Sequence, residues 1–209
     1  HMQNKELNTC KQDIYYFLHI RLPTTPRLKE EGTYKEGRKD GVYKEYYSDG
    51  VALKKEAPFK EGKLNGIVKT YYTNGKLETE KGYAMSIEDG VERDYDYESG
   101  EITTNRNYKN GVLHGSQIAH YGSNIGDFIQ RVTYENGKMT GSFSEIFTDG
   151  TIKKTGKYNK DGEKDGEWLE RDDFPNDKGK FSGKRTLYKD GEIIKEEIIK
   201  DFVKFQQKK

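Results

Sequence analysis

The stretch Lys60–Tyr83 reads KEGKLNGIVKTYYTNGKLETEKGY and combines a tyrosine pair with three spaced glycines. Those glycines are Gly62, Gly66 and Gly75. Asn74-Gly75 is a strong hairpin signal, because both central residues of a type I′ turn need positive φ. The segments on either side are rich in Val, Ile, Thr and Tyr, the residues typical of β-strands. The stretch therefore predicts a β-hairpin.

The same arrangement recurs along the chain. One aromatic residue marks the start of each unit, at separations of 25, 24, 25, 26, 24 and 23 residues. These residues are Tyr34, Phe59, Tyr83, Tyr108, Tyr134, Tyr158 and Phe181. A period of about 24 residues indicates a repeat architecture, in which each unit contacts its neighbours.

Glycines punctuate each unit at fixed offsets. A pair four residues apart follows the aromatic residue in five units: Gly37 and Gly41, Gly62 and Gly66, Gly111 and Gly115, Gly137 and Gly141, Gly162 and Gly166. Ser86 replaces the first glycine of the third unit. A further glycine follows Asp, Asn or Ser at Gly50, Gly75, Gly100, Gly150 and Gly191. We assign all of these glycines to turns, and the tight type I′ turn to the third glycine of each unit.

Aromatic residues also recur three positions before the third glycine. They are Tyr47, Tyr72, Tyr97, Phe147 and Tyr188. Because side chains alternate between the two faces of a strand, such positions stack into ladders across a sheet. Residues 32–196 are thus predicted to form an all-β fold: an elongated, twisted, single-layer antiparallel meander of about seven hairpins.

Two stretches carry a family resemblance, YKEGRKDGVYKEYYSDG at residues 34–50 and FKEGKLNGIVKTYYTNGKL at residues 59–77. Their pattern resembles the bacterial variant of the MORN repeat, and it extends over about residues 32–196. The resemblance implies successive β-hairpins in an antiparallel meander. It also implies a likeness to YwqK-type antitoxins, whereas other MORN proteins are membrane-associated or scaffolding modules.

The two ends depart from the repeat. Residues 1–31, which begin with an apparent cloning remnant and contain the apolar run IYYFLHI at 14–20, are predicted to cap the sheet. Residues 197–209 are predicted to form a short capping helix or tail. The apolar residues Ile194, Ile198, Phe202 and Phe205 recur at helical spacing, although the first of these also fit a strand.

Two units are irregular. HYGSNIGDF at residues 120–128 delays the third glycine to Gly126, and WLERDDFPNDKGKF at residues 168–181 brings in Pro175. Insertions in repeat arrays form loops on one face, which is often the binding face. Simple decay of the repeat explains both insertions equally well.

Composition limits the kind of partner. The chain has 209 residues, of which 31% are hydrophobic and 35% charged, and its formal net charge is +1. This balance gives no field to attract nucleic acid or an anionic membrane. Cys10 is the only cysteine, so no disulfide forms within the chain, which suits a cytoplasmic location; a lipoprotein or exported origin is the alternative. No run of 18 apolar residues predicts a transmembrane helix.

Catalytic and metal-binding motifs are missing from the sequence, so we expect neither an enzyme nor a cofactor. His114 and His120 are six residues apart, but the repeat places them in a turn and a strand, and His19 is distant. Asp161–Asp172 superficially matches a calcium loop, but the repeat explains its glycines better. We therefore predict no metal site.

The hypothesis that the sequence favours is a protein-binding module, most specifically an antitoxin or immunity protein that masks a partner protein. Aromatic residues on an open sheet give large contact area at low entropic cost. The candidate contact residues are Tyr43, Tyr46, Tyr71, Tyr95, His120, Phe143 and Trp168, with Trp168 as the anchor. Shielding of the sheet backbone is the structural alternative for each of them.

Two other functions stay open. A membrane-surface or cell-envelope scaffold would use the lysine-flanked apolar stripe of the C-terminal segment. A carbohydrate-binding sheet would stack sugars on tyrosines. The sequence leaves the oligomeric state undecided.

Overall fold

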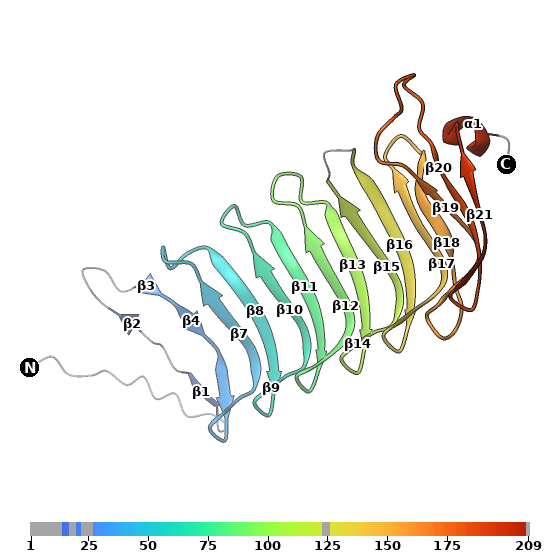
Figure 1. Cartoon of the computed structure of the whole chain (residues 1–209). Coiled ribbons are helices and arrows are strands. Elements are labelled where there is room, and N and C mark those ends of the chain that lie inside the picture. The colour runs from blue at the N-terminus through green and yellow to red at the C-terminus, as the bar shows by residue number, and fades with distance from the viewer. Residues whose placement is uncertain (1–13, 17–19, 22–26, 123–125, 208–209) are drawn as a thin grey trace, which may run out of the picture. The chain divides into compact units, whose positions relative to one another are not determined.

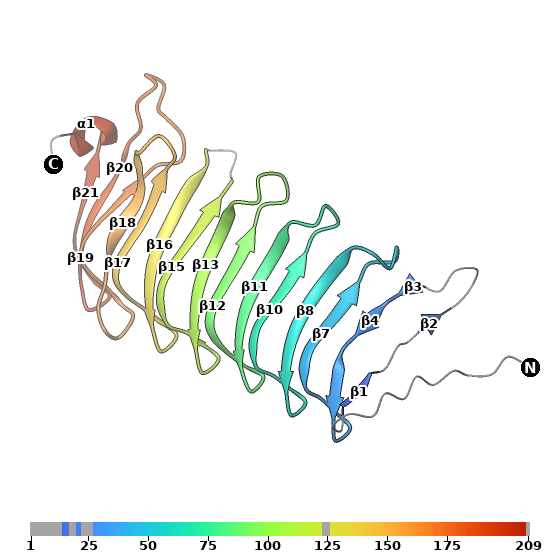
Figure 2. The same ribbon diagram turned by 180° about the vertical axis from the view of Figure 1, so that it is seen from behind.

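The computed structural model describes residues 14–16, 20–21, 27–122 and 126–207. Cys10, His19 and most of the predicted N-terminal cap lie outside these residues. The predicted all-β fold is confirmed: the strands form an open antiparallel meander, and one short helix follows the last of them (Figure 1). The same strands seen from behind form a single layer within each half of the chain (Figure 2).

Sixteen strands belong to the main sheet, and its order follows the chain. The earlier strands are β4 (Glu30–Glu31), β7 (Gly41–Tyr46), β8 (Leu53–Lys60), β9 (Lys63–Leu64), β10 (Gly66–Tyr71), β11 (Leu77–Ala84) and β12 (Ile87–Tyr95). The later ones are β13 (Ile102–Lys109), β14 (Val112–Leu113), β15 (Gly115–Tyr121), β16 (Phe128–Glu135), β17 (Lys138–Phe147), β18 (Ile152–Tyr158), β19 (Lys164–Arg171), β20 (Gly183–Lys189) and β21 (Glu192–Ile199).

Short strands near the N-terminus form two small sheets. β1 (Ile14–Tyr16) pairs with β5 (Thr33–Lys35), which pairs with β6 (Arg38–Lys39). β2 (Ile20–Arg21) pairs with β3 (Arg27–Leu28). The chain as a whole divides into two compact units: the first comprises residues 1–90 and 94–101, and the second residues 91–93 and 102–209.

Most of the tight turns lie at the first glycine position of a unit and not at the third. Two consecutive residues with positive φ, as a type I′ turn requires, occur at Glu36-Gly37, Glu61-Gly62, Met85-Ser86, Asn110-Gly111, Asn136-Gly137 and Asp190-Gly191. At the third glycines Gly50, Gly75, Gly100 and Gly150 only the glycine itself has positive φ, as in Gly75 at 82°. The side chain before it closes the turn instead, since Asn74 Oδ1 accepts a hydrogen bond from the Lys76 amide. The prediction of a type I′ turn at the third glycine was therefore wrong at these four positions, whereas at Gly191 the two positive φ values agree with it.

The second glycine of each pair faces the aromatic residue of the next strand. Cross-strand pairs are Gly41 with Phe59, Gly66 with Tyr83, Gly115 with Tyr134, Gly141 with Tyr158 and Gly166 with Tyr188. The last pair corrects the predicted repeat, because Tyr188 and not Phe181 is the aromatic residue of the final hairpin. Residues 172–182, between β19 and β20, are an insertion. Because of it, the repeat spacing from Tyr158 leads to Phe181 and not to Tyr188.

Buried side chains gather on one face of the second unit. Val132, Phe143 and Trp168 form a buried cluster. Tyr134, Met139, Tyr158 and Tyr188 pack against it. Gly156 makes room for Trp168, because a β-carbon at residue 156 would lie 2.1 Å from Cδ2 of the indole. The cluster therefore depends on the large side chain of Trp168 lying beside Gly156, which has no side chain.

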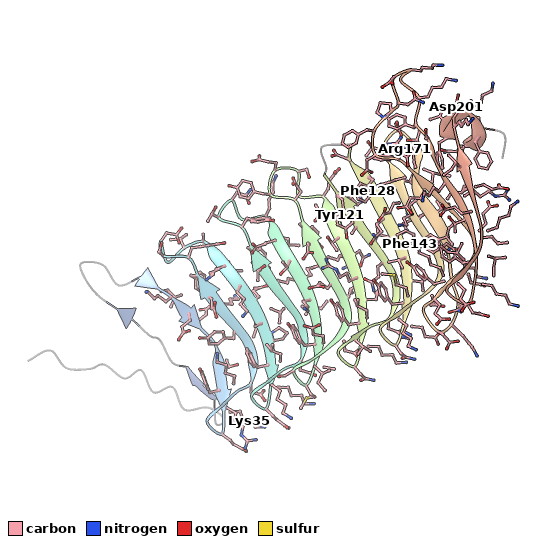
Figure 3. The ribbon with its side chains drawn as sticks, viewed as in Figure 1. Lys35, Tyr121, Phe128, Phe143, Arg171 and Asp201 are labelled. Atoms are coloured by element: carbon pink, nitrogen blue, oxygen red, sulfur yellow. The ribbon has the colours of Figure 1, made fainter. Side chains whose placement is uncertain are left out.

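Helix α1 (Phe202–Gln206) follows β21. Asp201 is its N-cap and accepts a hydrogen bond from the Lys204 amide, and Phe202 is fully buried where it meets Gly183. Figure 3 labels Asp201 at the start of this helix. β21 continues to Ile199, so the helix begins five residues later than the predicted boundary at 197.

Candidate protein-interaction surface

Strand register assigns the side chains of the first unit to two faces. Tyr43 lies opposite Ala57, and Lys44 lies opposite Glu56. Because neighbouring residues of a strand point to opposite faces, Tyr43 and Ala57 share one face while Lys44 and Glu56 share the other. In β10 the same alternation separates the buried Val68 from Lys69.

The seven predicted contact residues do not form one surface. Tyr43, Phe143 and Trp168 are buried, with exposed fractions of 8%, 6% and 3%. Trp168 stacks on Phe143 at 5.5 Å between ring centroids and donates a hydrogen bond from Nε1 to the Lys157 carbonyl. A side chain so covered has little area to offer a partner. Trp168 is therefore a core residue, and its assignment as the anchor is corrected.

Three of the predicted tyrosines occupy equivalent, half-buried positions in the first unit. Each hydroxyl donates to the carboxylate of a glutamate 15 residues earlier in the chain. The bonds are Tyr46 to Glu31 at 2.8 Å, Tyr71 to Glu56 at 3.0 Å and Tyr95 to Glu80 at 2.7 Å. Each bond fixes its tyrosine ring, so the ring keeps one orientation on the face.

Lysines complete this arrangement. Lys44 lies 3.6 Å from Glu31, and Lys69 lies 3.5 Å from Glu80. Each of these glutamates thus receives both a tyrosine hydroxyl and an ammonium group. Ion pairs as exposed as these contribute little to stability, but they balance the charge of the face.

The tyrosine–glutamate bonds alter the acidity of the phenols. The hydrogen bond to Glu31, together with burial, raises the pKa of Tyr46 to about 12. Burial, together with the hydrogen bond to Glu56, raises the pKa of Tyr71 to about 12. Both phenols therefore stay protonated and neutral at physiological pH, and both remain hydrogen-bond donors.

Exposed apolar side chains lie beside these pairs. Val42 is 52% exposed and Ile67 is 47% exposed, and each precedes a lysine and a tyrosine on the same face of its strand. We call this surface the tyrosine face. It consists of Val42, Lys44, Tyr46, Ile67, Lys69, Tyr71 and Tyr95 with Glu31, Glu56 and Glu80.

The remaining candidates lie apart from the tyrosine face. His120 is exposed on β15, opposite Ile129, and belongs to the second unit. His114 Nδ1 lies 3.5 Å from the Asn136 amide, which donates to it. Within residues 28–122 and 126–207 no three His, Cys, Asp or Glu side chains gather as metal ligands. Asp161–Asp172 forms a turn in which Asn159 Oδ1 accepts from two backbone amides, and then strand β19.

The two irregular segments differ in what they contact. The insertion at residues 172–182 reaches the helix: Phe181 accepts a hydrogen bond from the Phe202 amide, and Lys180 pairs with Asp201 at 2.7 Å. Residues 123–125 of the other segment lie outside the described part of the chain. Beside them Tyr121 stacks on Phe128 at 5.1 Å, and both are labelled in Figure 3. Among the described residues, no helix has the length and apolarity needed to span a bilayer.

Comparison with known proteins gives no relative: no family model matches the chain, and no curated protein does.

The contact residues predicted from the sequence include the tyrosines of this face but not their glutamates. A usable signal was present, because Glu31, Glu56 and Glu80 each precede a tyrosine by 15 residues. The mixed charge of the strands hid it, since 35% of the chain is charged and many carboxylates alternate with lysines. A charge becomes informative only when the register shows which tyrosine it faces.

Proposed function

We propose that this protein is a non-catalytic protein-interaction module that binds a partner protein through the tyrosine face. The observation that carries the proposal is the repetition of one oriented tyrosine–glutamate pair at Tyr46, Tyr71 and Tyr95. A sheet needs no such bonds for its backbone pairing. Strands two positions apart in a sheet lie about 10 Å from each other, so the three tyrosines form a regularly spaced row.

The physical properties of the row suit protein contact. Tyrosines supply large contact area with little loss of rotamer freedom, and rings fixed in advance by a hydrogen bond lose still less on binding. Val42 and Ile67 add exposed apolar area between the charged pairs. Tyrosine is enriched at protein–protein interfaces, and the lysines and glutamates of this face, which are types depleted there, are paired with one another or with the tyrosines.

The identity of the partner as a toxic protein is a more specific proposal than protein binding itself. The likeness of the repeat to YwqK-type antitoxins supports an antitoxin or immunity role, in which the tyrosine face masks a toxic protein. A surface that binds without a reaction is sufficient for that role. This part of the proposal rests on the resemblance alone.

The membrane-scaffold alternative, which the MORN resemblance suggests, loses the helical stripe that was its predicted contact with the membrane. The apolar stripe expected on one C-terminal helix is divided, since Ile194 and Ile198 lie in β21 and Phe202 is buried in α1. It therefore forms no continuous helical face that could enter a lipid surface.

A capture experiment tests the proposal. The full chain and its Ile67→Arg variant are immobilised, exposed to lysate of the source cells and read by quantitative mass spectrometry. The wild type is expected to retain one protein in stoichiometric amount, and the variant at least about tenfold less of it, as for a central interface residue. Val112→Arg is the matched control, because Val112 is 44% exposed in the second unit.

The outcomes separate the two levels of the proposal. Equal capture by both variants, or no stoichiometric protein with the wild type, would refute binding through the tyrosine face. A captured protein that does not arrest growth when expressed alone would refute the antitoxin role and leave the interaction module standing.

A further inference from the structure

The last strand of the sheet presents an edge to solvent. β21 pairs with β20 on one side and ends the strand order. Six of its eight residues are exposed, among them Ile193 at 59%, Ile194 at 57% and Ile198 at 64%. A long edge strand with exposed apolar side chains is a template for pairing with another strand.

The strand at the opposite end of the order is different. β4 has two residues, Glu30 and Glu31, which accept hydrogen bonds from Tyr43 and Tyr46. A short, charged edge strand is a common protection against edge-to-edge pairing. β21 is long, so it lacks the first protection, and part of its charge is neutralised within the strand, where Lys195 pairs with Glu197.

The sequence of β21 is nearly symmetric about its centre. Residues 193–199 read IIKEEII, with Glu196 in the middle. If two such strands run antiparallel with the Glu196 residues opposite each other, Lys195 faces Glu197 of the second copy and Ile194 faces Ile198 of the second copy. Both matches occur twice, because the arrangement has a two-fold axis.

We propose that β21 pairs with β21 of a second copy of this chain, so that the two sheets join through this edge. The charges favour this occupant. Lys195 already lies 2.5 Å from Glu197 within the chain, and the second copy would add a matching pair beside it. The two Glu196 carboxylates meet at the axis, and each is already paired with its own Lys184 at 3.2 Å.

Register within the chain agrees with the pairing. Lys195 and Glu197 lie opposite Leu187 and Arg185, and thus on one face, whereas Glu196 and Ile198 lie on the other. A two-fold axis perpendicular to the sheet joins like faces, as the matches require. A bulge at Ile194 ends the regular part of the strand, so residues 195–197 are the part of the shared ladder that is regular in both copies. An interface this small predicts a reversible dimer.

Charge reversal provides the test. In a homodimer of the Lys195→Glu variant, two carboxylates face each other at both matched positions, and in a homodimer of the Glu197→Lys variant two ammonium groups do. Each variant alone is therefore expected to be monomeric. An equimolar mixture of the two variants is expected to form heterodimers, because both facing pairs are then of opposite charge. The Lys195–Glu197 pair within each chain stays broken in the mixture, as does the Arg185–Glu197 pair in the Glu197→Lys chain, so recovery reports on contact between copies.

Light scattering after size exclusion measures the mass at several concentrations. At about 100 µM the wild type is expected to approach twice its 24.2 kDa and to dissociate on dilution, as a small interface should. Lys160→Glu, in an exposed loop, is the control and should dimerise like the wild type. Circular dichroism establishes that every variant is folded.

Three results would overturn the inference: a monomeric wild type at this concentration, single variants that dimerise as well as the wild type, or a mixture of variants that stays monomeric. Each is read from the same measurement. The test involves no other protein and no residue of the tyrosine face, so its result is independent of the proposed function.

Discussion

The two compact units use the same strand positions to build different interiors. In the first unit the central positions of neighbouring strands hold Tyr43, Ala57, Val68 and Lys81, and Lys81 lies directly opposite Val68. Its ammonium group pairs with Glu88 at 2.7 Å. In the second unit the corresponding positions hold Val132, Phe143 and Trp168, which form a buried cluster, and Gly156, against which Trp168 packs.

The difference shows that the hairpin repeat and the interior are separate properties of the chain. The turns and the backbone ladder recur in both units, because backbone hydrogen bonds do not depend on the side chains. Apolar burial does not recur. The second unit should therefore hold most of the hydrophobic stabilisation, and the first should depend more on polar pairs.

Removing a buried side chain from each interior should show the difference in stability between the two units most clearly. Trp168→Ala is expected to lower the free energy of unfolding by about 3–5 kcal/mol, because it leaves a cavity among Phe143, Tyr158 and Tyr188. Val68→Ala is expected to cost about 1–2 kcal/mol. Urea unfolding followed by circular dichroism measures both variants.

Hydrogen exchange then locates the loss. Trp168→Ala should accelerate exchange in β16–β20, and Val68→Ala should accelerate it in β8–β11. Equal costs for the two variants, or acceleration throughout the chain in both, would contradict a difference in stability between the units.

Filling the space under the indole should have the next largest effect. A β-carbon at residue 156 would lie 2.1–2.6 Å from three atoms of Trp168, so Gly156→Ala is expected to cost about 1–3 kcal/mol and to change tryptophan fluorescence. Gly122→Ala is the matched control, because its nearest neighbour is Asp127 Oδ1 at 3.6 Å. Similar melting temperatures for the two variants would show that Trp168 is not tightly held.

Sequence alone was sufficient for the meander because its signals are local. An aromatic residue and a glycine pair recur at nearly constant spacing, and each hairpin needs only its own turn and two strands. The site of the tight turn was misjudged because both glycine types follow polar residues, as in Asn74-Gly75 and Asn110-Gly111. The two turns differ in side-chain capping, which dipeptide identity does not reveal.

The contact surface was harder to predict, because it depends on which residues of each strand point to the exposed face of the sheet. Trp168 follows its second glycine, Gly166, by two residues and Tyr71 follows Gly66 by five, so the repeat separates their faces, but the spacing does not say which face is buried. The most informative feature was a missing side chain. Gly156 lacks the side chain that its strand position would otherwise carry, and a large ring on the next strand occupies the space. Pairing such small and large residues requires the register that only a structure supplies.

A single hydroxyl tests the polar pairs of the first unit. Tyr71→Phe removes the bond to Glu56 and keeps the ring, so the expected cost is about 0.5–1.5 kcal/mol. The control is Tyr97→Phe in the same unit, a ring that is 42% exposed and that keeps its edge contact with Tyr72. Differential scanning calorimetry compares the melting temperatures. Equal values would mean that the tyrosine–glutamate bond adds nothing to stability, and the tyrosine face would then be held by strand pairing alone.

High pH should weaken the first unit through the same bonds. An unfolded tyrosine has a pKa near 10, whereas those of Tyr46 and Tyr71 are raised to about 12 in the folded chain. The contribution of a group whose pKa is raised on folding is complete below the unfolded pKa and is lost as pH rises through the folded value. Stability should therefore fall between about pH 10 and pH 12.

The Tyr46→Phe/Tyr71→Phe double variant tests this expectation. It should be less stable than the wild type at neutral pH but lose less stability over that interval. Tyrosinate absorbance at about 295 nm should show two fewer late-titrating phenols. A double variant with the same slope as the wild type would place the late titration in other buried tyrosines, such as Tyr43 and Tyr158, whose pKa values burial also raises.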